Sequence, residues 1–356
     1  MIDRRTFISH ASSLGLAIGG TALTGCTTQQ GSSVDGQGAQ GRTGAHHQNA
    51  DSRLDTSLAH PPAPTSATGA ASAQNASFQR FDPTLPPLPA ARTIDLHWHA
   101  REVPIRISDD TVVAAWTFEG NTPGPIIHCR VGDTVNFTLT NDVDVPHSMD
   151  FHAAQIDPKV AFRSVIKGQS ITYSFKPKYA GAFAYHCGTA PVLMHLGSGM
   201  NGAIIVSPRE PLAPAKEFVL VQSEFYLGAA PVDGGIRAFD YQKMLATLPD
   251  FVVFNGRPNQ YVKEPIEVSV GDRVRFWVVN AGPTHSCSFH IVGEQFDTVY
   301  LGAPPGSAIH GVQTWEVTAG GGMCFELVCD VPGEFPFVNH GFGHGQKGAI
   351  GVLAVC

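Results

Sequence analysis

The chain has 356 residues, 38 of them Gly and 26 Pro, and a net charge of −7. This length is enough for two domains and a tail, and the composition favours turn-rich β structure over helices. Because the charge is negative and no basic stripe occurs, we do not expect a nucleic acid partner. No apolar run is long and pure enough to predict a transmembrane helix.

The first 26 residues have the features of an export signal. DRRTFIS at residues 3–9 contains the adjacent arginines of a twin-arginine signal, and a mildly apolar, Gly- and Ala-rich stretch follows. LTGC at residues 23–26 is similar to a lipoprotein cleavage site, which would make Cys26 the lipidated residue. Cleavage elsewhere, as in an ordinary signal, is the alternative. We expect export by the twin-arginine route to the periplasm or cell surface, with a lipid anchor in the membrane.

Residues 27–84 consist mainly of Ser, Thr, Ala, Gly, Gln and Pro, with few large apolar side chains. Such a segment cannot bury enough apolar surface to offset the entropy of ordering it. We therefore expect a disordered tether between the signal and the folded part of the chain.

Residues 85–208 and 209–356 repeat one β pattern. The segments 126–142 (IIHCRVGDTVNFTLTND) and 266–282 (IEVSVGDRVRFWVVNAG) both alternate apolar and polar residues around Val-Gly-Asp, as half-buried strands do. A Phe-His pair follows each of them. We predict an all-β fold of two tandem Greek-key β-sandwich domains, joined by a Pro-rich linker, with a short helix or lid at 237–250.

The first domain contains one set of potential copper ligands. A copper that transfers electrons favours two imidazoles, one thiolate and a weak axial thioether. His147 supplies one imidazole, and the short segment after it supplies Cys187, His195 and Met200. We predict that these four residues bind an electron-transfer copper.

His186 precedes Cys187 directly and cannot easily join the same copper, because neighbouring residues in a strand point to opposite faces. The same argument separates His152 from His147, so we expect His152 and His186 to share a second copper. The third imidazole is best sought in the second domain, at His340. Three His ligands and an open position are the plan of a catalytic metal site.

Two further residues could move protons at this second site. Asp150 lies between the two ligand His of its loop, and His290 has the repeat position equivalent to His152. Groups that contact an open metal position without binding the metal are natural proton donors. For His290, a structural role in a strand is the alternative.

With these residues in place, the sequence resembles the copper-containing nitrite reductases, in particular their lipoprotein-like branch with a short loop between the Cys and His ligands. The resemblance covers about residues 92–355. It rests on the motifs WTFEGNTPGPII (116–127), PHSMDFHAA (146–154), YHCGTAPVLMH (185–195), GMNGAIIV (199–206), VFNG (253–256), FHIVGE (289–294) and FVNH (337–340).

The resemblance implies two cupredoxin domains per chain, a homotrimer, and one type 1 and one type 2 copper per chain. The type 1 ligands match His147, Cys187, His195 and Met200, and the type 2 ligands match His152, His186 and His340 of the partner subunit. The catalytic pair matches Asp150 and His290, and the residue that covers the substrate matches Val292. The implied reaction is one-electron reduction of nitrite to nitric oxide, with electrons from a small blue-copper protein or a cytochrome.

Some segments depart from the family or have no role in it. The loop 155–164 replaces a Gly-rich one near the expected substrate approach, and His344 is an extra residue, expected either near the metal or on the surface. His97 and His99 form an isolated His-Trp-His motif. Disulfides and buried free thiols both remain open for five cysteines, namely Cys129, Cys287, Cys324, Cys329 and Cys356.

Two other functions compete with nitrite reduction. A two-domain, laccase-like multicopper oxidase would need a His after the copper Cys, where this chain has Gly188, and a His where it has Asp150. A blue-copper electron-transfer lipoprotein without catalysis would not need the three His of the second site. The altered loop 155–164 is the feature that favours this last alternative.

Overall fold

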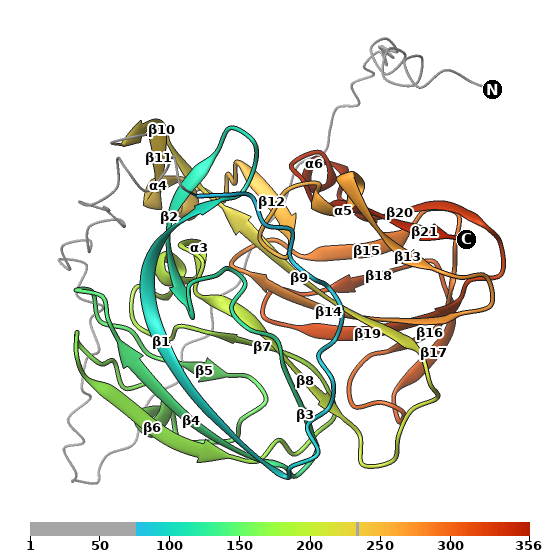
Figure 1. Ribbon diagram of the computed structural model, residues 1–356, viewed down its shortest axis with the longest axis horizontal. Helices are drawn as coiled ribbons and strands as arrows, with labels where there is room; N and C mark the ends of the chain where they lie inside the picture. The colour runs from blue at the N-terminus through green and yellow to red at the C-terminus, as the bar shows by residue number, and fades with distance from the viewer. Residues whose placement is uncertain (1–75, 233–234) are drawn as a thin grey trace, which may run out of the picture. The chain divides into compact units, whose positions relative to one another are not determined.

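The computed structural model describes residues 76–232 and 235–356, and its regular elements are mainly β-strands (Figure 1). The predicted signal, Cys26 and most of the predicted tether lie outside the described residues. Within the described ranges, no helix is long and apolar enough to cross a membrane.

The first β-sandwich pairs a six-stranded with a four-stranded sheet. The larger sheet has the order β10 (Leu227–Val232), β11 (Ile236–Phe239), β2 (Val112–Phe118), β1 (Thr93–Arg106), β4 (Thr134–Asn141), β6 (Ser170–Phe175). The smaller has the order β3 (Ile127–Arg130), β8 (Asn201–Ser207), β7 (Gly181–His186), β5 (Asp150–Phe151). Strands β4 and β6 alternate buried and more exposed residues because each has one face in the core.

The second β-sandwich has a six-stranded and a five-stranded sheet. The first has the order β12 (Phe251–Phe254), β9 (Lys216–Phe225), β14 (Arg273–Gly282), β19 (Gly322–Val328), β16 (Phe296–Tyr300), β17 (Ala308–Val312). The other has the order β13 (Glu264–Val268), β21 (Ile350–Val355), β20 (Gly333–Asn339), β15 (Cys287–Ile291), β18 (Thr314–Val317). Non-consecutive strands are neighbours in every sheet, and the predicted all-β class with two cupredoxin-like sandwiches is confirmed.

The helices are short and lie in the connections between strands. They are α2 (Pro158–Ala161), α3 (Val192–Gly197), α4 (Tyr241–Leu245), α5 (Gln260–Lys263) and α6 (Phe342–Gly345). Helix α4 lies within the segment where a helix or lid is expected, and the side chain of Asp240 caps it by accepting from two backbone N–H groups. The residues just before it form β11, which joins the first sandwich by pairing in parallel with β2.

The two sandwiches pack through an apolar cluster between their sheets. Small residues of β7 and β8, including Ala182, Ala184 and Ala203, meet Val219 and Trp277 of the second sandwich there. The approach is close, since a Cβ atom at position 322, which is Gly, would lie 2.2 Å from the carbonyl oxygen of Ala182. The second sandwich is therefore a rigid support for the strand that ends at His186.

The end of the predicted disordered tether is instead anchored. Phe81 N donates to Gln260 Oε1 (2.8 Å), and Tyr261 Oη donates to the carbonyl of Phe81 (3.1 Å). Thr84 then forms a β-bridge with Phe218. Phe81 and Thr84, at the end of the predicted tether, are thus held by the second sandwich through these hydrogen bonds and this bridge.

None of the described cysteines forms a disulfide. Cys129, Cys287, Cys324 and Cys329 are buried free thiols, and Cys356 is an exposed one. Of the two alternatives left by the sequence, free thiols are correct for these residues. Burial raises the pKa of Cys129 to about 12 and that of Cys329 to about 11, so both stay protonated and unreactive at neutral pH.

A buried ion pair in the second sandwich gives a test of its packing. Arg275 is almost fully buried, donates through Nε to Glu326 Oε1 (2.7 Å) and holds the linker through the carbonyl of Ala213 (2.8 Å). Arg275→Met should lower the free energy of unfolding, measured in urea, by about 3–5 kcal/mol, because it leaves the Glu326 charge buried without its cation. The double variant Arg275→Met/Glu326→Leu should recover much of this loss, and a double variant no more stable than the single one would contradict this account.

Candidate copper centres

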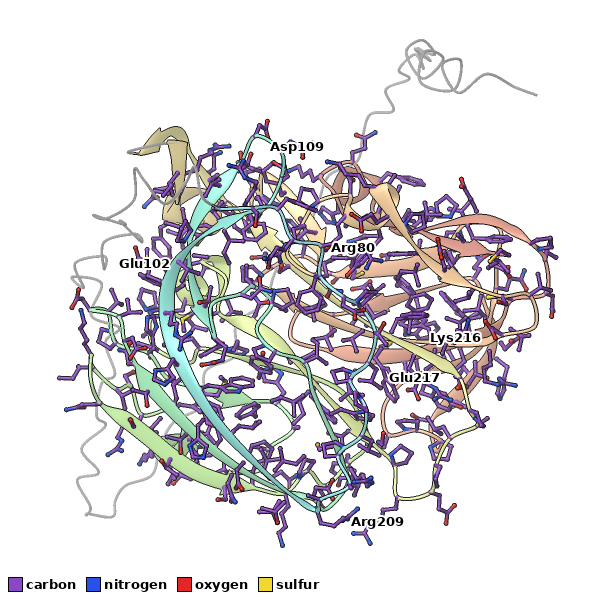
Figure 2. The ribbon with its side chains drawn as sticks, viewed as in Figure 1. Arg80, Glu102, Asp109, Arg209, Lys216 and Glu217 are labelled. Carbon is purple, nitrogen blue, oxygen red and sulfur yellow. The ribbon has the colours of Figure 1, made fainter. Side chains whose placement is uncertain are left out.

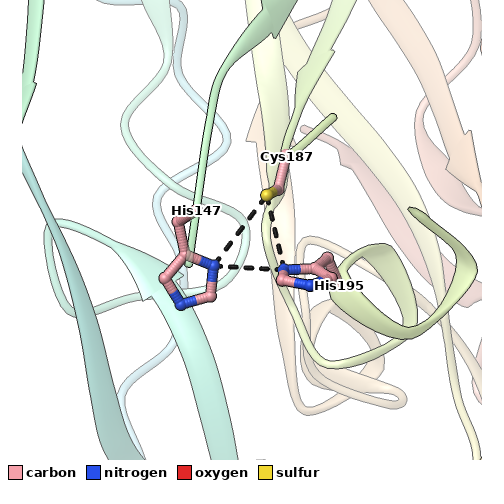
Figure 3. A group of neighbouring side chains, drawn as sticks. All are labelled: His147, Cys187 and His195. Carbon is pink, nitrogen blue, oxygen red and sulfur yellow. Dashed lines mark hydrogen bonds between the residues drawn. The ribbon is translucent and has the colours of Figure 1, made fainter. Parts of the chain in front are cut away.

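The first ligand set lies inside the first sandwich (Figure 3). His147 is in the loop before β5, Cys187 follows the last residue of β7, and His195 is in α3. Their donor atoms form a triangle: Nδ1 of His147 lies 3.1 Å from Nδ1 of His195, and Sγ of Cys187 lies 3.9 Å and 3.4 Å from these two nitrogens. Donors that share one first-row metal ion at roughly 2 Å each lie about 3–4 Å apart, so the triangle fits one ion.

Burial controls the protonation of this set. All three residues are completely buried, and burial lowers the pKa of His147, with His195 adding to the shift, to about 3 and the pKa of His195 to about 4. Both imidazoles are therefore neutral and available as ligands at ordinary pH. Burial also raises the pKa of the Cys187 thiol, while hydrogen bonds from Ser148 and Thr189 act in the opposite direction. Two imidazoles and a thiol without a carboxylate are a donor set that suits copper.

Met200 is placed beside Cys187 by the backbone. Its carbonyl accepts from Cys187 N (3.2 Å), and its own N–H donates to the carbonyl of His195 (3.2 Å). Met200 is completely buried in the same core cluster as Cys187. The structure thus brings all four predicted residues of the first set together.

The second ligand set lies on the other face of the same strand end. His152 Nε2 is 2.9 Å from His186 Nε2, and Asp150 Oδ2 lies 3.9 Å and 3.8 Å from these two nitrogens. Asp150 pairs with His186 directly across β5 and β7. The side chains are partly open to solvent, with exposed fractions of 31% for His152, 20% for Asp150 and 15% for His186. A small substrate could therefore reach them.

Backbone carbonyls fix which nitrogen each of these imidazoles presents. His186 Nδ1 donates to the carbonyl of Cys187 (3.0 Å), and His152 Nδ1 donates to the carbonyl of Gly320 in the second sandwich (2.9 Å). With Nδ1 protonated, each Nε2 carries a lone pair and is free to bind a metal. Burial raises the pKa of Asp150, against a smaller opposing effect of His186 and His152, so the carboxyl group keeps a proton to a higher pH than usual.

His290 and His340 lie together on the second sandwich. Their ring centroids are 5.3 Å apart. His290 donates from Nδ1 to the carbonyl of Gln313 (2.6 Å). His340 follows β20 and is exposed. Val292, 44% exposed, follows β15. Among the described residues, the group of potential metal ligands around Asp150 contains His152 and His186 but not His340. Within one chain, the structure therefore leaves the second set with two imidazoles.

His344 has a partner that the sequence did not reveal. Its ring lies 4.6 Å from that of His285, which stands in PTHSCSFH as His147 stands in PHSMDFH. At the position that corresponds to Cys187, the second sandwich has Asn339, whose N–H donates to the carbonyl of Ala349 (3.0 Å) as that of Cys187 does to Met200. Asn and Ala thus replace the thiolate and the thioether, and this second pair of imidazoles lacks the soft ligands of a blue copper.

The remaining predicted residues lie away from both sets or brace them. His97 and His99 are in β1, where His99 Nδ1 bonds to Asp142 (2.8 Å). The loop 155–164 contains α2 and leads into Val165, which exchanges two backbone hydrogen bonds with His147 (3.1 and 2.8 Å). The residue that follows this loop therefore supports the first ligand set.

The fold and the two donor sets define a two-sandwich copper protein of the cupredoxin type. Comparison with known proteins agrees: residues 93–211 match the multicopper oxidase family model. A copper-containing nitrite reductase of Neisseria meningitidis is 39% identical over 261 residues, covering 71% of this chain and 67% of that protein. The chain thus spans about two thirds (66–67%) of the length of the Neisseria relatives that it matches.

Solved structures give the same result. A copper nitrite reductase from Nitrosomonas europaea has a TM-score of 0.70 and 34% identity, covering 74% of this chain and 94% of that one. A copper-containing nitrite reductase from Thermus scotoductus has a TM-score of 0.68 and 29% identity, covering 74% and 62%. This chain belongs to the family of copper-containing nitrite reductases.

The buried imidazoles predict the acid sensitivity of the metal-free protein. The pKa values of His147 and His195 are lowered by folding, so below about pH 6.5 the unfolded chain binds more protons than the folded one. The contribution of these two histidines to the free energy of unfolding should be fully present above that pH. It should fall as the pH drops toward 4, by up to about 1.4 kcal/mol per pH unit for each histidine. Urea unfolding of the metal-free chain at several pH values measures this slope.

The variant His147→Gln/His195→Gln should lose most of the slope, and the exposed His97→Gln is the matched control that should keep it. An equal slope in the double variant would show that other groups cause the acid sensitivity.

Proposed function

We propose that the protein reduces nitrite to nitric oxide and water, consuming one electron and two protons per nitrite. The balance is NO₂⁻ + 2 H⁺ + e⁻ → NO + H₂O. The observation that carries this proposal is the placement of two donor sets on the adjacent residues His186 and Cys187, with a carboxyl group directed at the solvent-accessible set. Family membership supports it, since the relatives are named copper-containing nitrite reductases.

Copper held by the two sets would supply one-electron transfer at the first and Lewis-acid binding of substrate at the second. His147, Cys187, His195 and Met200 would hold one copper per chain, buried and without access for substrate. His152 and His186 would present Nε2 to another. The peptide between Cys187 and His186 links the two sets by covalent bonds, and the hydrogen bond from His186 Nδ1 to the Cys187 carbonyl shortens this link. A small blue-copper protein or cytochrome outside the chain would deliver the electron.

Asp150 and His290 would handle the two protons. Because its pKa is raised, Asp150 can hold a proton at Oδ2 and pass it to the nitrite oxygen that leaves as water. His290 would supply the second proton, with its ring held by the carbonyl of Gln313. Val292, exposed near it in sequence, would cover the bound substrate.

The missing third imidazole points to a subunit interface. His340 is exposed and lies beside His290, so a neighbouring chain could bring both to the incomplete set of Asp150, His152 and His186. In a ring of three chains each contact joins two different surfaces, and every chain would then complete the site of its neighbour. We therefore propose a homotrimer with the second copper between subunits, and export with a lipid anchor at Cys26 as the setting in which it works.

Nitric oxide formation tests the reaction and the role of Asp150. Copper-loaded protein with a reduced mediator should produce nitric oxide from nitrite under anaerobic conditions. Asp150→Asn should lower the rate at least ~100-fold, because it removes a proton donor and keeps the shape of the side chain. Asp109→Asn, a carboxyl group 83% exposed, is the control and should leave the rate unchanged. Oxygen consumption without nitric oxide would favour the multicopper oxidase alternative, and neither reaction would favour a simple electron carrier.

Mixed assemblies test whether two chains share a site. Asp150→Asn and His340→Asn should each be inactive alone. When the two variants are co-expressed in equal amounts, about a quarter of the sites in random trimers should have both native residues, and about a quarter of the wild-type rate should return. A mixture that stays inactive, although the chains co-assemble in native mass spectrometry, would place Asp150 and His340 at the same site of one chain or at no common site.

A further inference from the structure

Trp116 forms the wall of the first ligand set on the side of β2. Its side chain is completely buried, and its ring centroid lies 5.4 Å from that of His147 and 4.9 Å from that of His195. Its backbone N–H donates to the carbonyl of Ser198 (3.0 Å), just after the helix that carries His195. One indole thus contacts both imidazoles and is itself fixed by the strand and by the adjoining loop.

The far side of this indole connects to a carboxyl group. Trp116 lies directly opposite Glu102 in the pairing of β2 with β1, and Trp116 Nε1 donates to Glu102 Oε2 at 3.1 Å. Glu102, labelled in Figure 2, is in β1 and is only partly exposed. Burial raises its pKa, the N–H of Trp116 lowers it, and the charge of Asp144 raises it.

We propose that Trp116 and Glu102 are positioning residues that set the reduction potential of the electron-transfer centre, an inference that rests on copper binding at the first ligand set. Trp116 fixes the orientation of two imidazoles at once. Through the indole N–H it also holds the Glu102 carboxylate behind them. A negative charge in a partly buried place favours the oxidised state of a nearby metal centre, which carries one more positive charge than the reduced state. The pair therefore lowers the reduction potential.

The second sandwich contains a second Trp-Glu hydrogen bond, which has no metal-ligand set beside it. Trp277 Nε1 donates to Glu217 Oε2 (2.7 Å), and Glu217 also pairs with Arg275 (3.0 Å). Trp277 lies in the apolar cluster between the sandwiches. The Trp277–Glu217 pair gives a control in the same chain, since the same chemical change can be made at a Trp-Glu hydrogen bond that touches neither His147 nor His195.

The test is a redox titration of the copper-loaded full chain, followed by the thiolate absorption band at pH 8, well above the ordinary range of carboxyl groups. Glu102→Gln keeps an acceptor for the indole N–H and removes only the charge. It should shift the reduction equilibrium toward the reduced state by on the order of tenfold, or ~59 mV for a one-electron couple. Glu217→Gln should leave the potential unchanged.

A double-mutant cycle shows whether Glu102 acts through the indole. Trp116→Phe keeps an aromatic wall but cannot hold the carboxylate, so it should raise the potential and alter the thiolate band. Adding Glu102→Gln to this variant should then shift the potential by about half or less of its effect in the wild type. A full, additive shift would show that the carboxylate acts independently of Trp116 and would overturn the inference.

The remaining outcomes separate this inference from the proposed function. If Glu102→Gln is folded and blue but has the wild-type potential, the pair has only a structural role and the inference is wrong, while nitrite reduction stands. If the wild-type chain shows no thiolate-copper absorption at all, the proposed electron-transfer centre is contradicted, and the inference fails with it.

Discussion

Successive side chains in a β-strand point to opposite faces, and both ligand sets depend on this constraint where β7 ends. Cys187 turns into the sandwich toward His147 and His195, while His186 turns out toward Asp150 and His152. One peptide group therefore separates a buried site from a solvent-accessible one. A single residue inserted or deleted at this point would exchange the two faces. Neither site could therefore change its spacing without disrupting the other.

The two environments suit two different tasks. The first set is completely buried, its imidazoles are kept neutral by burial, and the rings are confined by Trp116 and by the core around them. Such a site can change its charge with little rearrangement. The second set is partly exposed, and its members are held through hydrogen bonds to carbonyls instead of apolar packing. Water and small anions can reach it, which a reaction that consumes protons requires. In the proposed reaction, electrons and protons would thus reach the two sets from different sides of one strand.

Much of this arrangement could be predicted from the sequence because ligand chemistry limits the choice of residues. His, Cys and Met in one segment specify a soft site, and strand alternation then separates His186 from Cys187. The contacts that escaped prediction involve groups with no sequence signature. The carbonyl of Gly320 belongs to a residue of any type, and the Trp116–Glu102 contact depends on the register of two strands. His285 was within reach, since its PTHSCSFH repeats PHSMDFH, but only the fold shows that His344 is its neighbour. The anchoring of residues 76–84 depends on a distant surface that composition cannot describe.

The contact at Gly320 gives the second sandwich a part in the second ligand set. This residue lies in the turn after β18, has φ +76°, and would bring a Cβ atom within 3.3 Å of the His152 ring if it were any other amino acid. Its carbonyl is what orients that imidazole from across the boundary between the sandwiches. A fragment that ended after β8 would keep every residue of the buried set and yet lack the carbonyl that orients the His152 ring. Such a fragment would keep the proposed electron-transfer site, and the proposed action on a substrate would require both sandwiches in one chain.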